Sequence, residues 1–258
     1  MNNALIAMTR QISPRFDECE LTHLDRQPID LDLARAQHRQ YEAALRELGC
    51  EVLSLPAEPD LPDSVFVEDV ALVFDEVAII TRPGADSRKP ETESVARALK
   101  PYRTLCFIET PGTLDGGDVL RVGRAVYIGL SSRSNRSAIE QLQGFLAPYG
   151  YTVKGVEITG CLHLKSAVTQ VSEDTLLINP AWVDRTILGD MRFIEVDESE
   201  PSAANAVWIE RAVIYPSGFP KTQQSLVDAG LRLKMVDATE VAKAEGAVTC
   251  CSLIFRRS

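Results

Sequence analysis

The sequence has no long apolar run, no secretory leader and no regular cysteine spacing, and each absence narrows the range of functions. No apolar stretch approaches the roughly 20 residues that a membrane-spanning helix needs. The first residues lack the basic start and long apolar middle of a secretory signal. Six cysteines occur without a framework spacing, which favours reduced thiols. We therefore expect a cytoplasmic protein with no membrane partner.

Positive charge is also scarce. Lys and Arg number 27 against 37 Asp and Glu, so the formal net charge is −10. Nucleic-acid binding needs clustered Lys and Arg, so we expect no nucleic-acid partner. An acidic surface mildly favours the approach of a cationic small molecule. The 258 residues, 45% hydrophobic and 25% charged, are ordinary for a globular protein with a large core.

Two common ligand-binding motifs are missing as well. Cys161, His163, Cys250 and Cys251 are all metal-ligand types, but no C-x₂-C pair exists and their spacing fits no zinc ribbon. The glycines in 112–117 lack the G-x-G-x-x-G order that opens a dinucleotide-binding helix. We expect no metal and no organic cofactor.

A unit of hairpin, helix and strand recurs about every 40 to 50 residues, which is typical of a repeat architecture. Four units are complete, and the fifth is split: 248–255 and 5–8 form its hairpin, and a helix capped by Asp30 or Asp32 and a strand at 51–55 complete it. Pairing of the two chain ends closes a ring, as in a propeller. We expect one domain over residues 1–258. The complete units place hairpins at 70–74/77–81, 119–122/125–128, 167–171/175–178 and 206–209/212–215, helices at 91–100, up to 147, near Trp182 and at 220–229, and closing strands at 104–108, 151–156, 192–196 and 231–236.

Two adjacent thiols near the C-terminus are candidates for nucleophilic chemistry. The stretch 246–255 is interpreted as a short strand with Cys250 and Cys251 at its entry. A thiolate needs a neighbouring base or cation, and only three histidines are available. His163 lies within Cys161-Leu162-His163-Leu164-Lys165, whereas His38 is expected at an exposed position of a helix. Adjacent cysteines without such a partner are more often buried small hydrophobes.

Asp115 and Asp118 stand on either side of a Gly-Gly bend, just before a strand, and favour a catalytic role for the cysteines over a purely structural one. Together with four other motifs, this stretch resembles the dimethylarginine dimethylaminohydrolase family, in matching order from about Leu5 to Phe255. The resemblance implies a five-bladed α/β propeller, the pentein fold, built from pseudo-symmetric ββαβ repeats with its site near the central axis. The five motifs are Leu114-Asp115-Gly116-Gly117-Asp118-Val119-Leu120, Leu162-His163-Leu164-Lys165-Ser166, Thr249-Cys250-Cys251-Ser252, Asp63-Ser64-Val65-Phe66-Val67-Glu68-Asp69 and Thr81-Arg82-Pro83-Gly84-Ala85.

The resemblance implies a hydrolase acting on C–N bonds of linear amidines, which converts Nω-methylated L-arginine to L-citrulline and a methylamine. The family's nucleophile is the first thiol of its motif, which selects Cys250; Cys251 is then expected on the opposite face of the strand, as a core thiol. His163 would protonate the departing amine and then activate water. Asp115 would orient His163 or bind a guanidinium nitrogen; some family members carry Glu there.

The same resemblance implies a set of substrate contacts. Without it, the adjacent acids Glu68 and Asp69 would be interpreted as part of a solvated loop. Arg88 and Arg133 would be interpreted as surface residues at the starts of helices. With it, acidic residues hold the cationic end, arginines bind the amino-acid end, and two backbone groups contribute. These residues are Asp63, Glu68 and Asp69, then Arg88 and Arg133, and finally Leu21 and Ala244.

Other functions stay open at this point. Related penteins deiminate arginine, transfer amidino groups or hydrolyse citrulline, but the chain lacks the long insertions of those larger relatives. A non-catalytic binding propeller is the alternative from another class, since a fold does not fix function; the joint presence of Cys250, His163 and Asp115 argues against it. The expected partner is a small molecule, a methylated arginine, and a homodimer is allowed.

The acidic residues assigned to the pocket also predict how the nucleophile is activated. Glu68, Asp69 and Asp115 disfavour a second negative charge, so the resting thiol of Cys250 should stay protonated near neutral pH. A guanidinium that arrives beside it brings a positive charge into a partly dehydrated site. We therefore expect the cationic substrate to promote formation of the thiolate.

Overall fold

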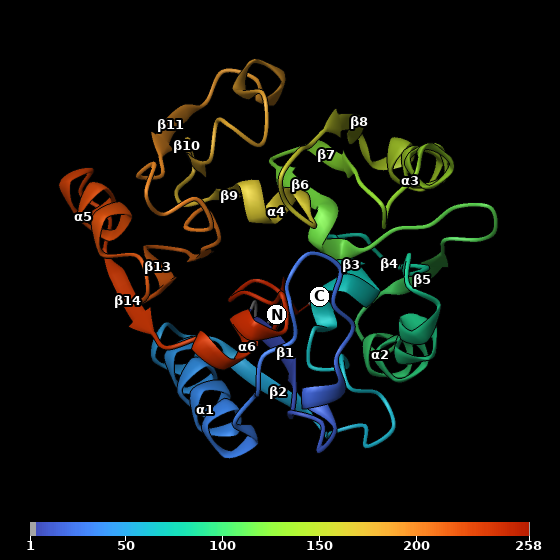
Figure 1. Cartoon of the computed structure of the whole chain (residues 1–258). Helices are drawn as coiled ribbons and strands as arrows, with labels where there is room; N and C mark the ends of the chain where they lie inside the picture. Colours follow the sequence, from blue (N-terminus) through green and yellow to red (C-terminus); the bar gives the residue numbers. More distant parts are fainter. Residues whose placement is uncertain (1–3, 258) are drawn as a thin grey trace.

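The computed structural model describes residues 4–257, so the first three residues and Ser258, which the domain prediction includes, lie outside it. Five three-stranded sheets stand around a common centre like blades (Figure 1). In each blade an antiparallel pair is followed by a strand that pairs in parallel with the second one. The ββαβ repeats predicted from the sequence are therefore present.

The bounds of the elements agree with the predicted units to within a few residues. The second blade along the chain holds β3 (Ala71–Val73), β4 (Val77–Ile80), α2 (Thr92–Leu99) and β5 (Thr104–Phe107), and the third holds β6 (Val119–Val122), β7 (Ala125–Leu130), α3 (Arg136–Leu146) and β8 (Thr152–Glu157). The fourth holds β9 (Val168–Gln170), β10 (Thr175–Ile178) and β11 (Arg192–Glu195), and the fifth holds β12 (Val207–Ile209), β13 (Ala212–Pro216), α5 (Pro220–Asp228) and β14 (Leu233–Val236).

The remaining blade joins the two ends of the chain. Strand β15 (Leu253–Arg256) pairs antiparallel with β1 (Leu5–Arg10), and β1 pairs in parallel with β2 (Glu51–Leu55). Helix α1 (Leu31–Glu47) connects the last two strands, and Asp30 caps it by accepting hydrogen bonds from the amides of Asp32 and Leu33. The prediction of a split blade that closes the ring is confirmed.

Three local predictions were wrong. The stretch that contains Cys250 and Cys251 is a turn before β15, because the strand begins only at Leu253. His38 is buried, with 5% of its surface exposed, because α1 packs against α6 (Thr239–Lys243) and β14 on the side that carries it. The short helix expected near Trp182 is a 3₁₀ helix three residues later, at Arg185–Leu188.

The loop between β1 and α1, blue in Figure 1, crosses the front of the ring at its centre. Backbone amides of its residues Thr22, His23 and Leu24 donate to the carboxylate of Glu245, which follows α6. One acidic side chain therefore fixes this loop across the end of the central axis. Among residues 4–257, no helix is long and apolar enough to span a bilayer.

Candidate active site

A small pocket lies beneath this loop at the centre of the ring. Its chemistry-bearing side chains come from segments that precede the inner strands. Cys250 lies in the turn before β15, Asp69 in a 3₁₀ helix (Val67–Val70) before β3, and His163 before the short helix α4 (Leu164–Ala167) and β9. Inner strands of different blades converge on the axis, so residues far apart in the sequence meet there. The pocket is lined by Glu20, Asp63, Phe66, Asp69, Arg88, Arg133, Leu162, His163, Ala244, Glu245, Gly246 and Cys250.

His163 is held by Asp115 from behind. Its Nε2 lies 3.1 Å from Oδ2 of Asp115, which is fully buried. The other carboxylate oxygen of Asp115 accepts a hydrogen bond from the amide of Gly84 at 2.9 Å. The Thr81–Ala85 motif thus supplies a backbone donor that orients the aspartate, and the aspartate orients the imidazole. Of the two roles predicted for Asp115, this geometry favours orientation of His163.

The two glycines beside Asp115 are needed for close approach. A Cβ atom on Gly116 would lie 1.9 Å from the carbonyl oxygen of Glu68. A Cβ atom on Gly117 would lie 2.7 Å from Nδ1 of His163 and 2.9 Å from Oδ1 of Asp69. Only glycine lets this bend pack directly under the residues of the site.

Asp118, the second acid of the motif, organises the loop that carries His163. One of its oxygens accepts the amide of Leu164 at 3.0 Å, and the other accepts the hydroxyls of Ser131 and Ser134 at 2.6 Å each. Burial raises the pKa of Asp118 to about 6, against the opposing effects of His163 and these donors. Near neutral pH this carboxylate is therefore mostly ionised and adds negative charge behind the imidazole.

The surrounding carboxylates set the charge of His163. Burial by itself would lower the pKa of the imidazole, but the charge of Asp69, the hydrogen bond that His163 donates to Asp115 and the charge of Asp118 raise it to about 9. His163 is therefore an imidazolium at neutral pH. A protonated imidazole that faces the pocket can donate a proton to a departing amine.

Asp69 is kept ionised by an arginine. Burial would raise the pKa of its carboxyl group, yet Arg88, whose Nη1 lies 2.6 Å from Oδ2, and His163 hold that pKa below its usual value. Arg88 is in turn bound by both oxygens of the buried Glu91, at 3.2 and 2.8 Å. The amide of Gly117 donates to the remaining oxygen of Asp69 at 2.9 Å. This arrangement fixes a negative charge at the pocket wall.

Cys250 lies in an environment that disfavours the thiolate. Burial, followed by the charges of Glu68 and Asp69, raises the pKa of its thiol well above the usual value. Cys251 is buried and packs in the core between α1 and the sheet edge, as expected, although it lies in a turn and not on the opposite face of a strand. The expected protonated resting state of Cys250 agrees with this electrostatic environment.

Glu68 lies behind the nucleophile and not in the wall of the pocket. Its carboxylate accepts from Nζ of Lys165 at 2.5 Å and from the hydroxyl of Thr249 at 2.7 Å, and its amide donates to the carbonyl of Cys250. These groups line a separate hollow along the inner strands. Glu68 therefore connects the turn of the cysteine to the loop of the histidine.

The other expected contacts lie around the mouth of the pocket. The guanidinium of Arg133 donates to the hydroxyl of Thr22, and Asp63 accepts the amide of Glu20, so both contact the crossing loop. Ala244 is buried in the pocket wall, whereas Leu21 is half-buried in the loop and packs against the core beside α1.

Two interpretations made without the resemblance were wrong. Arg88 and Arg133 are only 4% and 8% exposed, so they are not surface residues. The pair Glu68 and Asp69 is also buried and is not a solvated loop, because charged partners compensate both carboxylates.

Within residues 4–257, one group of metal-ligand side chains is brought together: Asp69, Asp115 and His163, with ligand atoms within 4.8 Å of one another. Their donors already serve the protein, since Asp69 binds Arg88 and Gly117 and Asp115 binds His163. A protonated imidazole is also a poor ligand. We therefore assign the group to the hydrogen-bond network. Within the same residues, the fold does not bring Cys161, His163, Cys250 and Cys251 together as a group of metal ligands.

Comparisons with known proteins agree with this arrangement. The family model described as N,N dimethylarginine dimethylhydrolase, eukaryotic, matches residues 18–191. The N(G),N(G)-dimethylarginine dimethylaminohydrolase of Streptomyces coelicolor is 40% identical over 97% of this chain and 96% of its own length. The enzyme of that name from Pseudomonas aeruginosa is 37% identical over 87% of this chain and 90% of its own. The chain belongs to the dimethylarginine dimethylaminohydrolase family.

Solved structures extend the comparison to the fold. A cysteine-to-serine variant of the Pseudomonas aeruginosa family member, complexed with citrulline, superposes with a TM-score of 0.93 at 34% identity over 99% of this chain and 100% of the other. The N-terminal domain of ArgZ superposes with a TM-score of 0.83 at 21% identity, which shows a common fold. The predicted pentein fold is confirmed.

Sequence reasoning missed several residues of this family member's site. Asp118 belongs to the Leu114–Leu120 motif, and its place three residues after Asp115 was an available signal. Lys165 and Thr249 belong to the motifs that contain His163 and Cys250. Glu91 had no signal beyond its position three residues after Arg88, which is the spacing of neighbours on a helical turn.

Replacement of Asp118 by Asn should lower the pKa of His163, because it removes one of the charges that stabilise the imidazolium. The proton of His163 is lost as pH rises through about 9 in the wild type, and at lower pH in the variant. NMR titration can follow it, because the chain has only three histidines. Asp75→Asn, at an exposed salt bridge with Arg121, should leave the titration unchanged. An unaltered pKa in Asp118→Asn would contradict the assigned role.

Gly116→Ala should disrupt the site, because the new Cβ would lie 1.9 Å from a backbone oxygen that has no room to move. We expect destabilisation of about 2 kcal/mol or more, with loss of activity. Gly144→Ala in α3 is the matched control: no atom lies within 4 Å of its new Cβ, and stability should rise by about 1 kcal/mol. Urea unfolding measures both. Equal stability of the two variants would show that the bend tolerates a side chain.

Proposed function

We propose that the protein hydrolyses Nω-methylated L-arginine to L-citrulline and a methylamine through a covalent intermediate on Cys250. The observation that carries the proposal is a single pocket that contains a thiol, an imidazolium and an ionised carboxylate, Cys250, His163 and Asp69. The names of the Streptomyces and Pseudomonas relatives support this substrate. So do two structures of family members, one with citrulline and one of a histidine-to-glycine variant as an adduct with S-methyl-L-thiocitrulline.

In the first half of the reaction the guanidinium lies against Asp69, whose negative charge is fixed by Arg88. With the guanidinium bound, the thiol of Cys250 loses its proton to solvent, and the sulfur attacks the central guanidinium carbon and forms a carbon–sulfur bond. The bond to the methylated nitrogen breaks, and that nitrogen takes the proton of His163. The amine leaves, and a thiouronium remains on the enzyme.

In the second half, neutral His163 accepts a proton from water, and the oxygen adds to the thiouronium carbon. The carbon–sulfur bond breaks, the remaining proton of the added water passes to the sulfur and restores the thiol of Cys250, and the oxygen becomes the ureido oxygen of citrulline. Asp115 holds the ring of His163 in one orientation through both transfers. The imidazole thus returns to its protonated state, and no other reactant is needed.

The substrate contacts named from the sequence complete the proposal. Asp63 and Asp69 favour a cation over a neutral ureido group, and Arg133 presents a guanidinium at the mouth of the pocket for the substrate carboxylate. Most N–H groups of Arg88 already donate to Glu91, to Asp69 or to backbone carbonyls. Arg88 would therefore contact the substrate through its one remaining Nη1–H. Leu21 and Ala244 complete the proposed set, whereas Glu68, behind Cys250, would act on the substrate through its charge and not by contact.

The proposal includes a single catalytic domain over residues 1–258, action in the cytoplasm without metal or organic cofactor, and the homodimer as the candidate oligomer. Closure of the ring by β1 and β15 supports one domain, because both chain ends belong to one blade. All six thiols, which fall within residues 4–257, are unpaired, as in a reducing compartment.

Purified protein should release citrulline and methylamine from Nω-methylarginine faster than it acts on arginine or citrulline. Cys250→Ser should lower kcat by at least about 10³-fold, because it removes the nucleophile. Cys251→Ser is the matched control: activity should stay within about threefold, with a stability loss of about 1 kcal/mol from the buried hydroxyl. Faster turnover of citrulline, or loss of activity only in Cys251→Ser, would overturn the assignment.

Alkylation of Cys250 by neutral iodoacetamide should show activation by the substrate. In the free enzyme the rate should keep rising above pH 8.5, the usual thiol pKa being about 8.5, because burial and carboxylates disfavour the thiolate. An unreactive alkylguanidinium should lower the apparent pKa, since its charge offsets those of the carboxylates. Cys250→Ser gives the background from the other thiols. An apparent pKa well below 8.5 without ligand would show that the protein alone activates the cysteine.

A further inference from the structure

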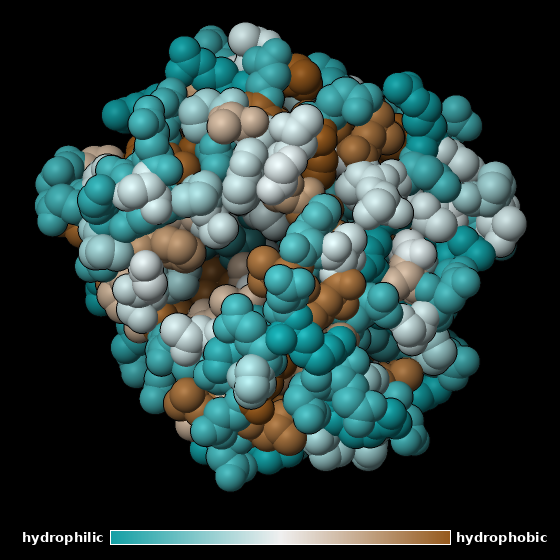
Figure 2. Space-filling model, in the orientation of Figure 1, coloured by the Kyte–Doolittle hydropathy of each residue, from teal (hydrophilic) through white to brown (hydrophobic). Residues whose placement is uncertain are grey.

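A second, larger cavity opens beside the catalytic pocket. It has a volume of about 300 Å³ and lies between the crossing loop, the turn before β15 and the two blades that contain β10 and β13. In the surface view it forms the hollow left of the centre, with hydrophobic atoms in its depth (Figure 2). The function proposed above does not use it.

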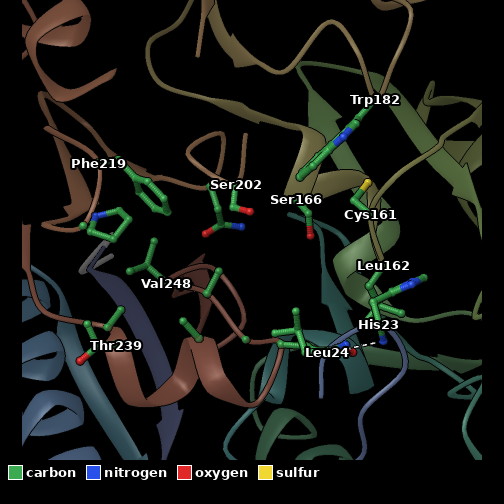
Figure 3. A pocket seen from close by; sticks show the side chains of 18 of the residues that line it. His23, Leu24, Cys161, Leu162, Ser166, Trp182, Ser202, Phe219, Thr239 and Val248 are labelled. Atoms are coloured by element: carbon green, nitrogen blue, oxygen red, sulfur yellow. Dashed lines mark hydrogen bonds between the residues drawn. The ribbon is translucent and has the colours of Figure 1, made fainter. Parts of the chain in front are cut away.

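The walls of this cavity are mainly apolar. Figure 3 shows Phe219 and Val248 on one side and Trp182 with Cys161 on the other, with Leu24 of the crossing loop at the edge. A cavity of about 150 Å³ with such walls can hold a benzene ring. The available space is therefore sufficient for an aromatic or branched alkyl group.

Three polar side chains in the wall already make hydrogen bonds within the protein. Glu245 accepts three backbone amides of the crossing loop, and Asp237 accepts the amide of Thr239. The side chain of Asn205 exchanges hydrogen bonds with Thr249 and donates to the carbonyl of Lys165. The polar atoms of these three side chains are thus partly or fully engaged, and most of the remaining lining is apolar. The cavity suits an uncharged apolar group.

The cavity adjoins the catalytic pocket. Leu162, Glu245 and Gly246 line both. Leu162 directly precedes His163, and its side chain is half-buried. A departing amine must lie within hydrogen-bond reach of His163, so a substituent on that nitrogen lies next to Leu162.

We infer that this cavity is a subsite for the nitrogen substituent of the guanidine, so that the enzyme hydrolyses Nω-alkyl and Nω-aralkyl arginines with substituents larger than methyl. The inference rests on the proposed function and extends its substrate class. Each additional buried CH₂ group favours binding by a factor of about four. With Nω-benzyl-arginine, water adds to the guanidinium carbon and the products are citrulline and benzylamine.

The test compares kcat/KM for Nω-benzyl-arginine and Nω-methyl-arginine within each variant. For the wild type the two values should lie within about tenfold. Ala242→Trp fills the cavity from the exposed side of α6, where there is room for an indole. It should lower the value for the benzyl substrate at least about thirtyfold and that for the methyl substrate by less than about threefold. Leu162→Ala should raise the ratio of benzyl to methyl, because it removes side-chain volume from the shared lining of the two cavities.

Val227→Trp is the matched control, because Val227 is exposed on α5 and lies outside the cavity wall. It should leave the ratio unchanged. The inference would be overturned if the wild type hydrolysed the methyl substrate while the benzyl substrate was neither hydrolysed nor a competitive inhibitor. An unchanged ratio of benzyl to methyl in Ala242→Trp would also overturn it. If the wild type fails on the methyl substrate, the proposed function fails. The subsite can then still be tested by alkylation of Cys250 with iodoacetamide. Bound Nω-benzyl-arginine should protect Cys250 in the wild type and should not protect it in Ala242→Trp.

Discussion

The site depends on keeping several buried side chains ionised at the axis of the ring. Asp69 is almost completely buried, and an isolated carboxylate there would take up a proton. Arg88 prevents this, and Glu91 holds Arg88 in place. His163 is in turn kept protonated by Asp69, Asp115 and Asp118. Each charge is thus stabilised by its neighbours, and removal of one partner would leave another uncompensated.

This balance explains how one pocket can hold both a weakly acidic thiol and a strong proton donor. The carboxylates that raise the pKa of the imidazole also raise that of Cys250. In the resting site the thiol and the imidazolium are therefore both protonated. In the proposed reaction, the positive charge of a guanidinium substrate would offset the carboxylates at the moment when the nucleophile is needed. The selectivity for a cation and the timing of nucleophile activation would then have the same electrostatic origin.

The propeller provides this arrangement through its turns. Cys250, His163 and Asp69 come from different blades, and each stands just before an inner strand or the short helix that leads to one. Glycines at the Asp115–Asp118 bend let these turns approach to contact distance. The crossing loop, tied to Glu245, Arg133 and Asp63, covers the site and also forms one edge of the neighbouring apolar cavity.

The sequence by itself determined the ring and the chemistry-bearing residues. The hydrophobic pattern of each ββαβ unit is local, so the strands and helices followed from periodicity, and the split blade followed from the need to pair β1 with β15. The motifs around Asp115, His163 and Cys250 identified the family. Only the tertiary structure decided which charges meet. The pairing of Arg88 with Asp69 and Glu91, the position of Glu68 behind Cys250 and the burial of His38 depend on packing between elements distant in the chain. The turn at Cys250 replaced the predicted strand for a similar reason: the 246–252 segment packs against Phe66 and hydrogen-bonds to Asn205 and Glu68, and these contacts override its local preference for a strand.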